Sequence, residues 1–148
     1  MIAAGRNEQD QLKHCALVDE LVGVMLHEGF TVTAADGVKG YSPPVELSND
    51  GYGDQEDKAP DVSAYDPVRK CYVIGEAKTG AGDLETHHAL TQWNVFLDQH
   101  HPRSGLPTYL YVILPSRFVP VFQGLITHYI HRDYWHRIVV VSSSLMAD

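Results

Sequence analysis

Two strand-like segments joined by a short turn place the strongest constraint on how this chain can fold. Asp61–Asp66 and Cys71–Lys78 read as strands, and the second is largely apolar until its end. The residues Pro67-Val68-Arg69-Lys70 between them suit a hairpin turn. The sequence therefore predicts an antiparallel hairpin whose second strand is central in a sheet.

The turn also predicts which residues of the hairpin face each other. If Asp66 pairs with Cys71, antiparallel pairing places Asp61 opposite Glu76. Opposed residues share a face, with Cβ atoms roughly 4.5–5.5 Å apart, and alternation along the strand adds Lys78 to that face. A slip of one residue would move Asp61 to the other face, so the prediction depends on this register.

Two carboxylates and one ammonium at one place suit a particular chemistry. Asp61 and Glu76 would repel each other without a partner, and one of them would tend to stay protonated. A divalent cation removes that cost, and an all-oxygen ligand set favours Mg²⁺, for which we expect Mn²⁺ to substitute. A nearby lysine can handle a water proton or an anion, so these residues indicate metal-assisted phosphodiester cleavage.

At these residues the chain resembles the PD-(D/E)xK nuclease superfamily, which has the restriction-endonuclease-like fold. The matching residues are Pro60, Asp61, Glu76 and Lys78, and the resemblance in element order runs from about Glu8 to Leu114. The resemblance implies an α/β fold with a mixed four- to five-stranded sheet flanked by helices.

Two further stretches resemble particular branches of that superfamily. Glu76–Asp83 is similar to the virus-type replication-repair nucleases (VRR-NUC), in which Gly-rich residues and an Asp follow the lysine. Gln92-Trp93 also fits their pattern, although Gln92 is equally interpreted as an ordinary polar residue on an amphipathic helix. Holliday-junction resolvases share the Gly-Phe that follows the first helix, here Gly29-Phe30.

The resemblance implies a role for each residue of the motif. Asp61 and Glu76 would bind Mg²⁺ together with the backbone carbonyl of Ala77, and Lys78 would orient or deprotonate the attacking water. The implied activity is that of a metal-dependent deoxyribonuclease. A domain of this size covers little DNA, so a homodimer is a plausible assembly.

The chain departs from the superfamily on its first helix. Many relatives carry a glutamate there that joins the metal site, and the equivalent slot falls near His14–Val18, where no Glu stands. The nearby polar residues are Asp10, His14, Asp19 and Glu20, none a clean match. Together with the net charge of -8, this leaves a second hypothesis open. The chain would then be a weak or inactive nuclease-fold module that binds nucleic acid or a protein partner.

The rest of the chain supplies the other predicted elements. Apolar residues at three- and four-residue steps predict helices, and β-branched or continuously apolar runs predict strands. The segment 36–59, rich in Gly, Pro, Asn and Asp, predicts a long loop. The other predicted elements are helices at Glu8–Glu28, Thr86–His100 and Val121–Tyr134, and strands at Phe30–Ala34, Thr108–Leu114 and Ile138–Ser142.

Composition bounds these hypotheses. The 148 residues suit a single domain, and 44% hydrophobic content is typical of a globular chain. No apolar run approaches the ~20 residues of a membrane span, and residues 1–10 turn polar too soon for a secretory signal. With two cysteines only, we expect a reduced cytoplasmic location. The charge of -8 argues against a strongly basic nucleic-acid module, but a local basic strip can coexist with it.

Histidines and surface cations have two interpretations each. The nine histidines, including His128 and His131 at helical spacing, suggest zinc, but scattered exposed histidines fit better. Arg69, Lys70, Lys39 and Lys58 would either contact phosphates or keep turns soluble; the sequence favours neither. Trp93 and Trp135 read as core or rim residues rather than base-stacking platforms.

Overall fold

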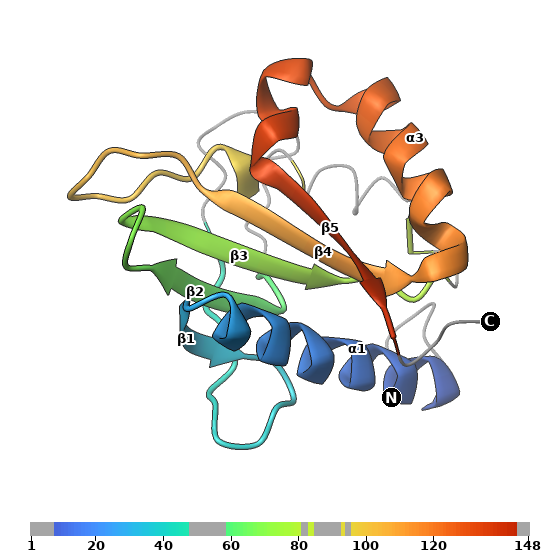
Figure 1. The fold of residues 1–148 in the computed structure, drawn as a ribbon. Coiled ribbons are helices and arrows are strands. Elements are labelled where there is room, and N and C mark those ends of the chain that lie inside the picture. Colours follow the sequence, from blue (N-terminus) through green and yellow to red (C-terminus); the bar gives the residue numbers. More distant parts are fainter. Residues whose placement is uncertain (1–7, 48–58, 81–82, 85–92, 94–95, 145–148) are drawn as a thin grey trace.

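The fold was analysed in a computed structural model, which describes residues 8–47, 59–80, 83–84, 93 and 96–144 (Figure 1). A helix and three strands come first, followed by a strand, a helix and a last strand. Their bounds are α1 (Glu8–His27), β1 (Thr31–Ala35), β2 (Val62–Asp66), β3 (Cys71–Ala77), β4 (Tyr109–Pro115), η1 (Ser116–Phe118), α3 (Val119–Tyr129), η2 (Arg132–Arg137) and β5 (Ile138–Ser143).

The five strands form one mixed sheet in the order β1-β2-β3-β4-β5. The pairs β1–β2 and β2–β3 are antiparallel, whereas β3–β4 and β4–β5 are parallel. The predicted α/β class, with a five-stranded mixed sheet flanked by helices, is confirmed. The five predicted strands are present with bounds within one residue of those expected, and β3 is central as predicted.

The predicted hairpin register is confirmed as well. Asp66 pairs with Cys71, and the ladder continues without a bulge to Val62 opposite Gly75. The ladder ends there: Asp61 precedes β2 and donates its N–H to Gly75 O at 3.1 Å, so the predicted pairing of Asp61 with Glu76 is not part of the ladder. Alternation then divides β3 between the two faces of the sheet, with Val73 on one face and Ile74 on the other.

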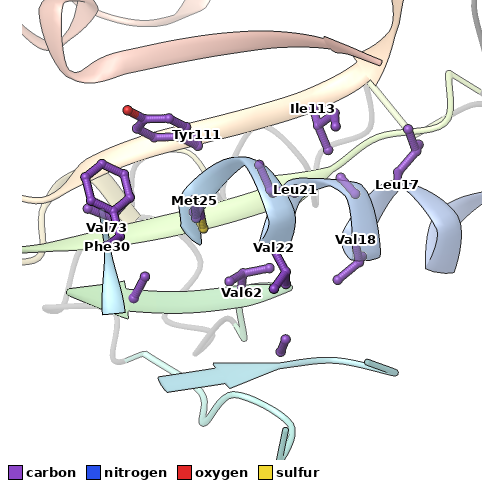
Figure 2. Close-up of a cluster of buried hydrophobic side chains, with 13 residues drawn as sticks. Leu17, Val18, Leu21, Val22, Met25, Phe30, Val62, Val73, Tyr111 and Ile113 are labelled. Atoms are coloured by element: carbon purple, nitrogen blue, oxygen red, sulfur yellow. The ribbon is translucent and has the colours of Figure 1, made fainter. Parts of the chain in front are cut away.

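Helix α1 covers one face of the sheet, where the first hydrophobic core forms (Figure 2). Its buried side chains recur at three- and four-residue steps, because those positions share one side of a helix. They pack on Val62 and Val73 from the hairpin and on Ile113 from β4. The fully buried members on the helix are Leu17, Val18, Leu21 and Met25.

A second core forms on the opposite face, beneath α3. Phe122 of this helix packs edge-to-face against Trp93, with ring centroids 5.5 Å apart. Most of the predicted helix Thr86–His100 lies outside the described residues, but Trp93, Phe96 and Leu97 within it are helical and buried. The sheet is thus packed on both faces, as a central strand like β3 requires.

The last helix differs from its prediction. It was expected to run to Tyr134, but α3 ends at Tyr129 and a separate 3-10 turn, η2, follows. Ile130 has an extended backbone, and its carbonyl accepts a hydrogen bond from the indole Nε1–H of Trp135. His131 then accepts a bond from the backbone N–H of Asp133 and starts the new turn. These side-chain bonds replace the helical ones that the apolar pattern predicts.

The segment 36–59 was predicted to be a long loop. Its described part, residues 36–47, contains turns and one isolated bridge residue, but no helix or strand. Residues 48–58 lie outside the description. Of the helices that are described, none combines the length and the apolar character needed to cross a membrane.

The close approach of α1 to β3 gives a first prediction, because it depends on Gly75. A Cβ atom at this position would lie 2.7 Å from Leu21 Cδ2 and 2.9 Å from Met25 Cε. Gly75→Ala should therefore lower the free energy of unfolding by about 1–3 kcal/mol, measured by urea denaturation. Gly124→Ala, on the exposed side of α3 with open space around it, should raise stability by up to about 1 kcal/mol. Equal effects from both substitutions would contradict this packing.

Candidate active site

The predicted site residues meet where β3 ends. Glu76 and Ala77 are its last two residues, and the next residue, Lys78, still donates its backbone N–H to Ile113 O of β4 at 3.0 Å. Asp61 directly precedes β2 and donates its N–H to Gly75 O at 3.1 Å. The hairpin therefore brings Asp61 and Glu76 to the same end of its two strands, as predicted.

The Asp61 carboxylate is held from two directions. Its Oδ2 accepts a hydrogen bond from the backbone N–H of Ala77 at 2.9 Å and one from His14 Nε2 at 3.2 Å. Because a carboxylate only accepts, His14 must carry a proton on Nε2. The Asp61 carbonyl also accepts from Asp36 N–H, just after β1. Asp61 is thus fixed by α1, by β3 and by the end of β1.

These bonds change the acidity of Asp61. Burial alone would raise its pKa, but hydrogen bonds from His14, Glu76 and Ala77 together lower it to about 2. Glu76 thus lies close to Asp61, and two ionised carboxylates at short range repel each other. A positive charge between the two acids is therefore stabilising.

Glu76 and Lys78 lie on the face opposite α1, and both are buried. Their exposed fractions are 2% and 6%, in a strand that is otherwise apolar. Lys78 Nζ lies 5.2 Å from the ring centroid of Trp93, which is 1% exposed. A cation so placed interacts favourably with the ring face. Trp93 is a core residue, as predicted, and buried charges beside it are expensive unless they serve a purpose.

The loop after Lys78 has its own anchor in Asp83. Its carboxylate accepts hydrogen bonds from Thr79 N–H at 2.7 Å, Gly80 N–H at 2.8 Å and the Thr79 hydroxyl at 3.1 Å. Gly80 has a φ of 85°, and a Cβ there would overlap the ring of Phe118. The Thr-Gly…Asp pattern that follows the lysine therefore fixes the chain where Lys78 leaves the sheet.

The first helix contributes His14 and not an acid. Asp19 is exposed, and the Glu20 carboxylate accepts bonds from the Ser143 hydroxyl at 2.7 Å and from Ser144 N–H at 2.9 Å. Asp10 lies one turn before His14 on the same side of α1. The signal that singles out His14 is helical phase, because it lies in step with the buried residues Leu17 and Leu21. Asp19 and Glu20 do not share this helical phase.

The remaining sequence candidates lie elsewhere. Gln92 and Lys58 fall outside the described residues, and Lys39 and Lys70 are exposed. The Arg69 guanidinium lies 3.3 Å from an Asp66 oxygen. Four other described histidines have local roles: hydrogen bonds in their own turns for His100, His101 and His131, and a ring contact with Tyr129 for His128.

Asp61 and Glu76 offer carboxylate oxygens, the type of ligand that Mg²⁺ prefers. In the part of the chain that is described, no three or more His, Cys, Asp or Glu side chains are grouped as metal ligands. Asp61 and Glu76 form a pair, and Mg²⁺ is usually bound by one or two carboxylates while it keeps several waters. Ala77 O is the further oxygen that the resemblance implies.

Comparison of the chain with protein-family models, with curated proteins and with solved structures found no match. The resemblance to PD-(D/E)xK nucleases therefore stays a prediction carried by Pro60, Asp61, Glu76 and Lys78. A function can be proposed from the geometry of these residues and from the chemistry that they allow.

The lowered pKa of Asp61 predicts a pH dependence of stability in the absence of divalent cations. A carboxylate whose pKa falls from 3.8 to about 2 on folding stabilises the protein above about pH 4, and this contribution is lost as the pH falls toward 2. The shift corresponds to about 2 kcal/mol. Urea denaturation in EDTA should therefore show wild type losing about that much more than Asp61→Asn between about pH 5 and pH 2. Parallel losses in the two proteins would contradict the hydrogen bonding at Asp61.

The loop after Lys78 gives a prediction with a matched control. Gly80 and Gly105 both have positive φ, but only Gly80 lies against Phe118. Gly105→Ala should cost about 1–2 kcal/mol, the penalty of the left-handed backbone. Gly80→Ala should cost more, because the Phe118 ring must also move. Thermal denaturation of both variants would measure the difference, and equal melting temperatures would contradict the contact.

Proposed function

We propose that the protein is a Mg²⁺-dependent nuclease that hydrolyses DNA phosphodiester bonds with an activated water. The observation that carries this proposal is the grouping of Asp61, which Ala77 N–H and His14 hold in place, with the buried Glu76 and Lys78 at the end of the central strand. Two neighbouring carboxylates repel each other, so the binding of a divalent cation between them is favourable. A buried ammonium beside them suits an anionic substrate. The five-stranded mixed sheet flanked by helices is the fold that the resemblance implies.

Each residue at this end of the hairpin has a separate proposed role. Asp61, Glu76 and the Ala77 carbonyl would hold the ion, which when bound lowers the pKa of water and neutralises charge on the phosphate. Lys78 is placed to orient the attacking water and to donate a hydrogen bond to a phosphate oxygen. Water attacks phosphorus, the bond to the leaving oxygen breaks, and that oxygen gains a proton.

His14 acts on this chemistry through Asp61. Its Nε2–H fixes one carboxylate oxygen, and Ala77 N–H binds the same oxygen, so the other oxygen remains for the ion. His14 is therefore a positioning residue. Asp83 has a similar role for Lys78, since it fixes the two residues that follow the lysine.

A nuclease assay tests the proposal directly. Purified protein with Mg²⁺ or Mn²⁺ should cleave members of a panel of linear and branched DNAs. Lys78→Ala and Asp61→Ala should lower the cleavage rate at least about a hundredfold, because each removes a group that acts on the water or binds the ion. The control is Lys39→Ala, an exposed lysine on another loop, which should cleave like wild type. Full cleavage by Lys78→Ala with its fold intact would overturn the assignment.

A binding module without catalysis is the second candidate, and one observation favours it. The first helix brings His14 to Asp61 where many members of the superfamily bring a glutamate, so the described donor set holds two side-chain acids instead of three. Calorimetric titration with Mg²⁺ or Mn²⁺ separates the two candidates. Binding that disappears in Glu76→Gln supports the nuclease. No binding to wild type, even with DNA present, supports the module.

A further inference from the structure

A cavity of about 470 Å³ opens on the same face of the sheet as Glu76 and Lys78. Its walls include Thr33 from β1 and Ser63 from β2, and its lining is mainly apolar. This volume lies in the range of small-molecule sites, and no part of the proposed chemistry uses it. Further lining residues are Tyr65, Tyr72, Ile74 and His100.

Aromatic rings gather at one end of this cavity. Tyr65 and Tyr72 are directly paired across the hairpin, and the ring of His101 lies against both, with centroids 5.2 Å and 4.8 Å away. Tyr72 is 37% exposed. The pair therefore keeps some side-chain surface accessible, on which a flat ligand could stack.

His101 is held in place by its own loop. Its Nδ1 accepts backbone N–H groups from Arg103 at 3.2 Å and Ser104 at 3.4 Å. The Ser104 hydroxyl donates to Lys70 O at 2.7 Å, so this loop and the hairpin turn lie side by side (Figure 1). The aromatic cluster is thus built from two segments that are fixed to each other.

Several exposed charges beside the cluster are positive, although Glu46, which lies between the lining residues Val45 and Leu47, is exposed as well. Lys70 and Arg103 are exposed on these two adjoining segments, and His100 is exposed at the cavity wall. The acid of the turn, Asp66, is 4% exposed and accepts bonds from Val68 N–H and Arg69 N–H. On a chain of net charge -8, cations beside open aromatic rings favour a ligand with both phosphates and bases.

The cavity lies in line with the candidate site. Tyr72 and Ile74 line it, and Glu76 follows at the next position on the same face of β3. Tyr72 and Glu76 are four residue steps apart along the strand, which is about 13 Å. That is the length of about four stacked nucleotides at ~3.4 Å each. The face of β3 between them is covered, since Ile74 is 3% and Glu76 is 2% exposed, so DNA bound at the cavity would lie beside the candidate site and not along this face.

We infer that this surface binds an unpaired DNA strand, with a base in the cavity against Tyr72 and phosphates on Lys70 and Arg103. The inference rests on the proposed function for the nature of the substrate, and it narrows that substrate to DNA with a single-stranded segment. Stacking on aromatic rings requires unpaired bases, because the faces of paired bases are covered by their neighbours in a duplex.

Binding without cleavage tests the inference. Fluorescence anisotropy in EDTA would measure affinity for a labelled single strand of about 12 nucleotides and for the matching duplex. The single strand should bind more tightly than the duplex. Tyr72→Ala should weaken single-strand binding about tenfold, and Tyr72→Phe, which keeps the ring, should stay close to wild type. The control Tyr129→Ala removes an exposed ring on α3 and should change nothing.

A second substitution tests the proposed phosphate contacts. Lys70 has a φ of 60°, a conformation that Asn tolerates, so Lys70→Asn removes the charge with little backbone cost. It should weaken binding and reduce the slope of log affinity against log salt by about one. Arg132→Asn, on exposed η2, is the matched control and should leave that slope unchanged.

The outcomes separate this inference from the proposed nuclease activity. Unchanged binding in folded Tyr72→Ala, or equal affinity for duplex and single strand, overturns the inference even if wild type cleaves DNA with Mg²⁺. Loss of binding in Tyr72→Ala supports the inference even if no cleavage is found, in which case only the proposed activity fails. An apolar peptide that binds here while DNA does not would also overturn it.

Discussion

Every contact at the candidate site depends on the pairing register of the β2–β3 hairpin. The turn itself sets that register. The Asp66 carboxylate accepts two backbone N–H groups of the turn, and its carbonyl accepts Lys70 N–H at 2.7 Å. A shift by one residue would turn Val62 away from α1 and separate Asp61 from Glu76. Gly75 lets α1 pack closely on the same strand, so the core and the site depend on the same alignment.

This register places charge where it costs stability. Glu76 and Lys78 are buried at the end of an apolar strand, close to Trp93. The closeness of Glu76 to Asp61 adds to that cost unless a cation lies between the two acids. Burial of charged groups contributes little to stability and is more readily explained by chemistry than by folding. The lowered pKa of Asp61 shows how strongly its surroundings favour the charged form of this acid.

Strand β3 connects the proposed nuclease site with the proposed surface for single-stranded DNA. Alternation puts Tyr72, Ile74, Glu76 and the following Lys78 on one face, so one strand carries both the proposed binding surface at its start and the acids at its end, with the buried Ile74 between them. The opposite face is fully used by the core under α1. Positive charge beside the aromatic cluster also explains how a chain of net charge -8 could approach DNA, because binding depends on the local field and not on the total.

The sequence by itself determined the elements and the hairpin. Turn residues and strand alternation are local properties, so they predict the register and the meeting of Asp61 with Glu76. The tertiary structure decided what surrounds them. His14 lies 47 residues from Asp61 in sequence, and only the packing of α1 on the sheet selects it over Asp19 and Glu20. The grouping of Tyr65, Tyr72 and His101, and the end of α3 at Tyr129, likewise depend on contacts that pattern alone does not encode. Local signals fix backbone direction and face, whereas the partner of each side chain depends on how distant segments pack.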